Sequence, residues 1–173
     1  MAQIGDIGID LGTSNVLIYM KGRGIVLREP AVVAVERDTR KSIAVGKEAL
    51  RMVGRTPASM QVIRPLRNGT VADFELARVM LQQFILQAVG RRFFSRPRAV
   101  ISVPSGVTDT EKRSIISALL DAGMRRTQIL DRPVAAALGI GLPFEDPYGT
   151  MIVDMGAGLT DIAILSSGKT KHF

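Results

Sequence analysis

Two segments share one design: DLGTSN at residues 10–15 and DMGAGLTD at residues 154–161. Each segment follows a short apolar stretch and precedes another, so each is predicted to be a turn between two β-strands. Each begins with an aspartate and continues with glycine and a hydroxyl-bearing residue. Glycine lets backbone amides come close to a ligand and permits positive φ angles, and successive amides in such a turn bind anions. The two segments therefore predict two turns that bind phosphate groups.

The chemistry of the side chains divides each turn into two roles. Amides and hydroxyl groups would contact phosphate oxygens, and the residues that carry them are Gly12, Thr13, Ser14, Asn15, Gly156, Ala157, Gly158 and Thr160. Asp10 and Asp154 repel phosphate, but they can hold Mg²⁺, which bridges to the phosphates through water. The alternative is that both segments are ordinary glycine turns of an antiparallel sheet. Neither fits a Walker-type phosphate loop or the dinucleotide-binding glycine fingerprint.

Outward from the first turn, the chain is predicted to begin with a run of strands. They are expected at residues 7–10, 16–20, 25–28, 31–35 and 42–45. A short helix is expected from Lys47 to about Val53. Residues 54–72 are expected to be irregular, because prolines and glycines interrupt them.

In the second half of the sequence, strands alternate with helices. One helix is predicted between Asp73 as N-cap and Gly90, because apolar residues recur there at helical spacing. The TDTE sequence at residues 108–111 predicts a capping box that opens a second helix. The remaining elements are strands at 99–103, 128–130, 151–154 and 161–165 and a helix from Val134. The fold class is therefore α/β.

Composition and charge restrict the class of protein. The chain is 46% hydrophobic and 23% charged, which is typical of a globular protein, and it contains no cysteine for disulfides or thiolate-metal sites. No apolar run reaches the roughly 18 residues of a membrane-spanning helix, and no signal peptide is present, so a cytoplasmic location is expected. The net charge of +7 indicates an anionic partner. No nucleic-acid-binding motif is present, so nucleic acid is not the expected partner.

Five further segments narrow the interpretation. They are GIVLREP at 24–30, AVG at 44–46, IRPL at 63–66, VGRRFF at 89–94 and VPSGVT at 103–108. The two turns resemble the phosphate motifs of the superfamily of actin, sugar-kinase and chaperone ATPases, and the five segments resemble the MreB family of bacterial actins. The resemblance implies an ATP-binding cytoskeletal protein that forms membrane-associated filaments and contributes to cell shape and wall synthesis.

The resemblance also implies an architecture and partners. The expected fold is the actin-like ATPase fold, a ribonuclease H-like lobe with a mixed sheet flanked by helices. The first lobe is expected at residues 1–150, with a small inserted subdomain at roughly 33–75, and residues 151–173 are expected to begin a second lobe, because the family's chain is longer. ATP and Mg²⁺ are the implied cofactors. The implied partners are further copies of the chain, an anionic membrane surface at the inner face of the cell membrane, and cell-shape and wall-synthesis proteins.

Two positions depart from the family pattern. The family usually has glutamate before the proline of the segment at 130–137 and threonine at the sixth position of the second turn, and both residues help to orient the water that attacks the γ-phosphate. This chain has Arg132 and Leu159 there. Arginine accepts no hydrogen bond from water, and leucine has no polar group. Hydrolysis is therefore expected to be weak or lost, unless Asp131 substitutes or the alignment is displaced by one residue.

A basic and aromatic segment predicts a membrane anchor. Residues 91–98 read RRFFSRPR, so Phe93 and Phe94 are surrounded by Arg91, Arg92, Arg96 and Arg98. Aromatic rings that enter a headgroup region beside cations that pair with anionic lipid form an interfacial anchor, and MreB proteins have a similar apolar loop. The alternative is that Phe93 caps the core and the arginines are simply solvated.

Two rival functions within the superfamily are a sugar-kinase-like lobe and a chaperone-like lobe. A kinase needs an aspartate that deprotonates the acceptor hydroxyl, and none can be assigned. A chaperone lobe is disfavoured because the segments at 28–30 and 103–105 resemble MreB.

Overall fold

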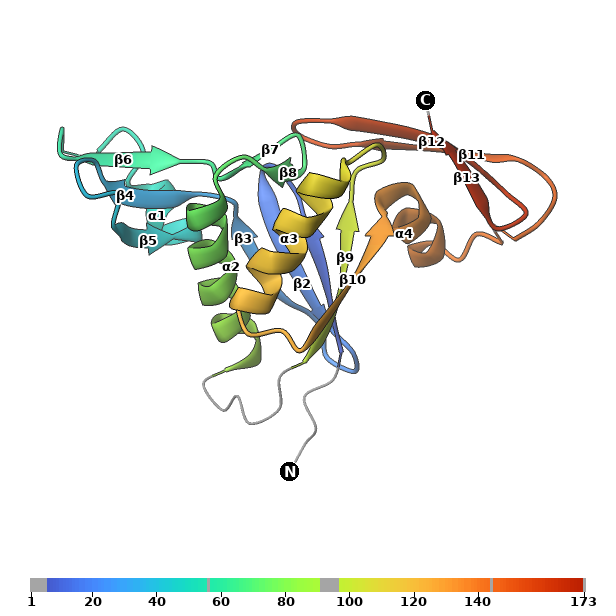
Figure 1. Cartoon of the computed structure of the whole chain (residues 1–173), viewed down its shortest axis with the longest axis horizontal. Coiled ribbons are helices and arrows are strands. Elements are labelled where there is room, and N and C mark those ends of the chain that lie inside the picture. Colours follow the sequence, from blue (N-terminus) through green and yellow to red (C-terminus); the bar gives the residue numbers. More distant parts are fainter. Residues whose placement is uncertain (1–5, 56, 91–96, 144, 173) are drawn as a thin grey trace.

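A five-stranded mixed sheet forms the centre of the molecule (Figure 1). The computed structural model describes residues 6–55, 57–90, 97–143 and 145–172. The sheet has the order β10-β9-β1-β2-β3, and its strands are β1 (Ile7–Leu11), β2 (Asn15–Met20), β3 (Gly24–Pro30), β9 (Arg98–Val103) and β10 (Arg126–Asp131). β1, β2 and β3 are antiparallel, whereas β9 and β10 run parallel to β1. The predicted mixed α/β class is confirmed.

Two helices, α2 (Phe74–Val89) and α3 (Asp109–Asp121), pack against this sheet (Figure 1). Both begin at the predicted caps. The Asp73 carboxylate accepts a backbone N–H of the first turn of α2 at 3.2 Å, and Thr108 and Glu111 form the capping box of α3. These caps satisfy amides that have no partner within the helix, so both helix starts are fixed by local sequence.

The core lies between the two helices and the sheet. Strand side chains alternate between the two faces, and on β1 the buried set is Ile7, Ile9 and Leu11, none more than 3% exposed. Phe84 of α2 is fully buried in the same cluster. The other face of β1 is half-buried and carries Asp10.

One row of side chains crosses that other face of the sheet. Asp10 is the register partner of Leu17 in β2 and of Ser102 in β9, and Leu17 is the register partner of Arg28 in β3. The row places an acid, a hydroxyl and a base next to the end of β1, where the first predicted turn begins.

A smaller sheet has the order β5-β4-β6. Its elements are β4 (Val33–Glu36), β5 (Ser42–Val45), β6 (Met60–Ile63) and the short helix α1 (Gly46–Arg51). Val45 precedes α1 and provides no side-chain cap. Instead, Glu29 of β3 accepts from the backbone N–H of Lys47 at 2.8 Å and lies 3.3 Å from its Nζ. A residue distant in sequence thus caps α1.

The expectation that residues 54–72 are irregular is wrong. β6 pairs with β4 in this segment, and β7 (Leu66–Arg67) and β8 (Thr70–Val71) form a hairpin. Asn68 and Gly69 connect the hairpin with φ angles of 51° and 73°. Asn-Gly is a strong signal for such a turn, and the prolines nearby masked it.

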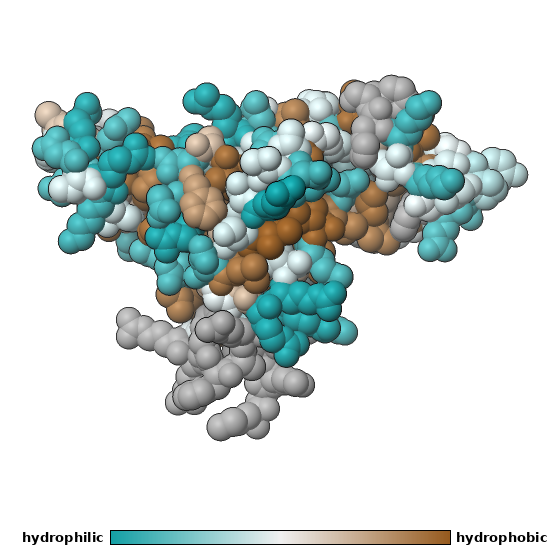
Figure 2. All heavy atoms as spheres, viewed as in Figure 1, coloured by the Kyte–Doolittle hydropathy of each residue, from teal (hydrophilic) through white to brown (hydrophobic). Residues whose placement is uncertain are grey.

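A third sheet has the order β11-β12-β13. Its strands are β11 (Thr150–Met155), β12 (Thr160–Ser166) and β13 (Lys169–His172), and α4 (Arg132–Gly139) packs between β10 and this sheet. The sequence did not predict β13. Hydrophobic residues gather on the viewed face around α4 (Figure 2), where Leu138 and Ile140 are 52% and 70% exposed.

None of the helices in the described part of the chain is long and apolar enough to cross a membrane.

Candidate functional site

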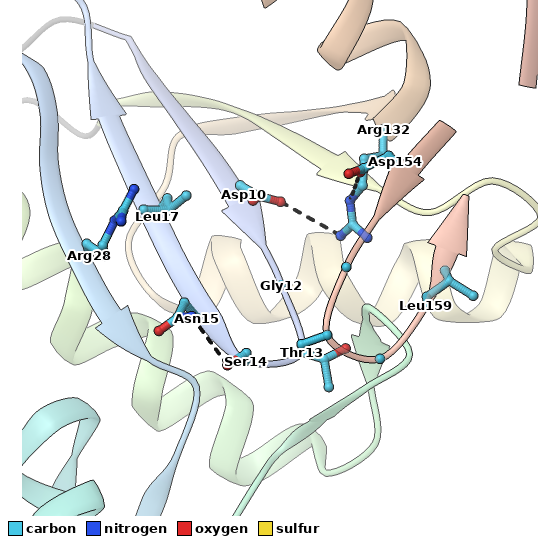
Figure 3. Close-up of a pocket in the computed structure, with 13 residues that line it drawn as sticks. Asp10, Gly12, Thr13, Ser14, Asn15, Leu17, Arg28, Arg132, Asp154 and Leu159 are labelled. Carbon is cyan, nitrogen blue, oxygen red and sulfur yellow. Dashed lines mark hydrogen bonds and ion pairs between the residues drawn. The ribbon is translucent and has the colours of Figure 1, made fainter. Parts of the chain in front are cut away.

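The two predicted turns meet at one cavity of about 310 Å³. Its lining residues are Asp10, Gly12, Thr13, Ser14, Asn15, Leu17, Arg28, Arg132, Asp154, Gly156, Ala157, Gly158 and Leu159 (Figure 3). The volume lies at the lower end of the range for small-molecule sites, about 300–1,000 Å³. Segments that are far apart in the sequence therefore form one polar site.

The two turns have the same backbone geometry. The amide of Gly12 donates to the carbonyl of Asn15 at 3.1 Å, and the amide of Gly156 donates to the carbonyl of Leu159 at 2.8 Å. A Cβ atom on Gly12 would lie 2.8 Å from the Asn15 oxygen, and one on Gly156 would lie 3.1 Å from the Leu159 oxygen. Close backbone approach thus requires glycine at position 12 and leaves little space for a side chain at position 156.

The expectation that the glycines of these turns have positive φ angles is wrong. The positive-φ glycines among the described residues do not include Gly12, Gly156 or Gly158. The amides of Gly12 and Gly156 are also already used inside their turns. Any amide that binds a ligand must therefore come from the residues that follow these glycines.

Thr13 joins three segments at the cavity. Its Oγ1 accepts from the amide of Gly69, in the β7–β8 hairpin, at 2.9 Å. A Cβ atom on Gly158 would lie 2.9 Å from the same oxygen. Gly158 therefore allows the second turn to lie against the first. Gly69 was not predicted as a site residue, because the hairpin that presents it was not predicted.

A buried carboxylate anchors the second turn. Asp161, the last residue of the quoted second segment, is 6% exposed and is the partner of Asp154 in the β11–β12 register. It accepts from the amide of Ser105, in the loop after β9, at 2.9 Å. A buried charge is stable only with such partners. The contact fixes the β11–β12 hairpin to the loop at the end of β9.

Arg132 lies between the two predicted metal-binding aspartates (Figure 3). Its Nη2 is 3.7 Å from Asp10 Oδ1, and its Nε is 3.9 Å from Asp154 Oδ2. Nη2 also donates to the Leu11 carbonyl at 3.4 Å. The Arg132 side chain is 14% exposed, whereas those of Asp10 and Asp154 are 47% and 37% exposed. The cation is thus held inside the cavity wall, and both acids remain accessible.

Asp10 has a second partner that the sequence did not suggest. Ser102 donates from its Oγ to Asp10 Oδ1 at 3.0 Å. Leu17 and Arg28 line the cavity as well, and they were also not predicted. Ser102, Leu17 and Arg28 all lie in the row of side chains across the sheet. Strand alternation predicts which face of the sheet each side chain occupies, but only the structure gives the register that places them beside Asp10.

Two predicted residues do not line the cavity. Thr160 begins β12 and is exposed, and Asp131 ends β10. Leu159 does line it, with a side chain that points away from Asp10 (Figure 3).

The predicted membrane anchor falls almost entirely outside the described residues. This holds for Arg91, Arg92, Phe93, Phe94 and Arg96. Arg98 is described, and its Nε donates to Asp6 Oδ1 at 2.8 Å. This hydrogen bonding raises the pKa of Arg98 and lowers the pKa of Asp6. Arg98 already has an anionic partner within the chain, so it is a weaker candidate for lipid contact than expected.

Comparison with known sequences gives consistent matches. The family model for MreB/Mbl protein matches residues 4–172. The cell shape-determining protein Mbl of Bacillus cereus is 50% identical over 163 residues, which cover 94% of this chain and 49% of the relative. The cell shape-determining protein MreB of Escherichia coli is 46% identical over 166 residues, which cover 93% of this chain and 48% of the relative. The chain spans about half the length of the curated relatives it matches.

Solved structures share the fold. The crystal structure of MreB5 of Spiroplasma citri bound to ADP has a TM-score of 0.85 at 35% identity and covers 96% of this chain and 51% of that chain. The AMPPNP-bound structure has a TM-score of 0.86 at 34% identity and covers 100% of this chain and 53% of that chain. A MamK double helical filament has a TM-score of 0.79 at 23% identity, which shows the fold alone. The actin-like ATPase fold is thereby confirmed, and the chain belongs to the MreB/Mbl family.

Proposed function

We propose that this chain is the nucleotide-binding part of an actin-like filament subunit that contributes to cell shape. One observation carries the proposal: two turns of the same geometry meet at a single cavity. The relatives are named cell shape-determining proteins, and MreB5 of Spiroplasma citri has been solved with ADP and with AMPPNP bound. The sugar-kinase and chaperone alternatives have no comparable support.

The phosphate groups would lie between the two turns. The amides of Thr13 and Ser14 on one side and of Ala157 and Gly158 on the other follow the glycines whose own amides are used. Successive amides in tight turns bind anions without a charged side chain. Arg28 adds a cation to the wall of the same cavity.

A positively charged side chain lies beside the two aspartates that were expected to hold Mg²⁺. Asp10 and Asp154 supply the oxygen ligands that Mg²⁺ prefers, but the Arg132 guanidinium lies 3.7 Å from one and 3.9 Å from the other. The residues present do not fit a divalent ion between the two aspartates. The proposal is therefore limited to the nucleotide.

Filament formation and the second lobe are part of the proposal. We infer that residues 1–150 belong to a first lobe, with an inserted subdomain at roughly 33–75, and that residues 151–173 begin a second lobe. The separate β5-β4-β6 and β11-β12-β13 sheets support this division. The partners would be further copies of the chain and cell-shape and wall-synthesis proteins.

Membrane association is proposed through Phe93 and Phe94. Burial of two aromatic side chains and about 1 kcal/mol for each nearby arginine at an anionic surface would hold the subunit at the inner face of the membrane. Flotation with anionic vesicles tests this. The double change Phe93→Ser and Phe94→Ser should abolish flotation, and unchanged flotation would exclude the segment as the anchor.

The function as a filament subunit is tested with a chimera. The part of Bacillus cereus Mbl that follows the matched region would be joined to this chain. The chimera should sediment with ATP and remain in the supernatant without it, and Gly158→Ala should prevent sedimentation. If intact Mbl sediments and the folded chimera does not, the proposal is wrong.

A further inference from the structure

Arg132 is held in one place by the residues around it. Its Nη2 donates to the Leu11 carbonyl at 3.4 Å, and a Cβ atom added to Gly69 would lie 3.3 Å from its Nη1. The low exposure of 14% leaves the side chain little room to turn away from the cavity. The guanidinium is therefore a fixed part of the site between Asp10 and Asp154.

The guanidinium lies next to the two carboxylates that were predicted to hold Mg²⁺. Asp10 and Asp154 together carry two negative charges, and the adjacent Arg132 guanidinium halves the net charge that a metal ion would meet between them. A second cation placed between the same two carboxylates would also be repelled by the first, and this repulsion is strong in a partly buried site.

The guanidinium still has donors to offer. Its distances to Asp10 and Asp154, 3.7 Å and 3.9 Å, are too long for hydrogen bonds. Its Nε is buried and has no hydrogen-bond partner among the residues that the structure describes. A buried donor without a partner is costly, so an additional acceptor at this position would stabilise the site. Phosphate oxygens are preferred acceptors of arginine, which binds them in planar pairs of hydrogen bonds.

We propose that this site binds the phosphates of a nucleotide without a divalent metal ion, because the Arg132 guanidinium takes the place of Mg²⁺. The inference rests on the proposed nucleotide-binding function and specifies it. Arg132 would shield the phosphates from Asp10 and Asp154 and donate hydrogen bonds to them. It is thus assigned as a ligand-binding residue.

The test compares nucleotide binding in two buffers of equal ionic strength. ADP is titrated into the full chain with excess EDTA or with excess MgCl₂, and the dissociation constants are measured by NMR, which detects weak binding. The wild-type chain should bind ADP with the same affinity in both buffers. Arg132→Gln should weaken binding in EDTA by roughly 10- to 100-fold, the loss of hydrogen bonds from a charged donor. Arg132→Glu should bind only in MgCl₂.

Arg28→Gln is the matched control. It removes the same charge from the same cavity wall, but Arg28 lies in β3 rather than between the two aspartates. It should weaken binding equally in EDTA and MgCl₂. A wild-type chain that binds ADP only in MgCl₂ would overturn the metal-free inference and leave the nucleotide-binding function intact. If neither buffer gives binding to the wild-type chain, the proposed function falls, and the inference falls with it.

Discussion

At the scale of single residues, Gly158 sets how closely the two turns approach each other. A Cβ atom there would lie 2.9 Å from Thr13 Oγ1 and 3.0 Å from Thr13 Cγ2. We expect Gly158→Ala to separate the turns and weaken ADP binding by roughly 10-fold or more, the equivalent of one hydrogen bond to a charged group. Titration of the purified chain checks this.

A second variant at the contact between Gly158 and Thr13 serves as the control. Thr13→Ala removes the two atoms nearest to the added methyl group, so Thr13→Ala with Gly158→Ala should recover part of the affinity lost in Gly158→Ala. Equal affinities of wild type and Gly158→Ala would show that the turns do not act together.

We also expect two residues of the cavity to limit any ATP hydrolysis at the proposed site. Arg132 and Leu159 line the cavity at positions where the resemblance implies groups that orient water. In the chimera with Mg²⁺, the double change Arg132→Glu and Leu159→Thr should raise phosphate release on the order of 10²-fold, because positioned water reacts faster. Each single change is the control. If the unmodified chimera hydrolyses ATP as fast as intact Mbl, the expectation is wrong, and Asp131 is the next residue to change.

The residues of the two turns could be found from the sequence because each turn is a local pattern. Asp10, Gly12 and Thr13 follow one another, and so do Asp154, Gly156 and Ala157. Ser102 and Arg28 could not be found in this way. They lie near Asp10 only because of the register between the strands, and this register depends on the packing of the whole sheet.

At the scale of elements, α3 depends on its N-terminal cap. Thr108 Oγ1 accepts from the Glu111 amide at 3.3 Å, and the Glu111 carboxylate accepts from the Thr108 amide at 2.9 Å. Thr108→Ala should lower the free energy of unfolding by about 1 kcal/mol. Urea denaturation checks this, with Thr110→Ala in the same exposed first turn as control. Equal losses in the two variants would contradict the capping role.

The cap also makes stability depend on pH. The side-chain hydrogen bond from Thr108, followed by that from its backbone, lowers the pKa of Glu111. The folded state therefore holds fewer protons on this group than the unfolded state. Its stabilisation is complete above the ordinary glutamate pKa of about 4.3 and is lost as pH falls through the lowered value. In Glu111→Gln, the free energy of unfolding should fall less steeply with decreasing pH in this acidic range than it does in the wild type. Denaturation curves that show the same pH dependence for the two proteins would contradict this.

Elements with strong local signals were predicted well, and elements fixed by pairing were not. Asp73 and the Thr108–Glu111 box are short-range patterns, and both caps are confirmed. β6 and β13 are short strands at sheet edges whose existence depends on the neighbouring strand. Glu29 lies in β3 and caps α1. A cap that comes from a residue so distant in sequence cannot be predicted from a local sequence pattern.

At the scale of the whole molecule, the site exists because separate sheets meet. The β1–β2 turn belongs to the central sheet, the β11–β12 turn belongs to the third sheet, and the β7–β8 hairpin lies against Thr13. Asp161 and Ser105 fix the third sheet to the end of β9. The central claim is that the two turns bind one polyphosphate together.

The most direct measurement is an NMR titration of the isotope-labelled chain with AMPPNP. The account predicts that the amide signals of Thr13 and Ser14 move together with those of Ala157 and Gly158, with one shared dissociation constant. Signals that move at only one turn, or at neither, would contradict it.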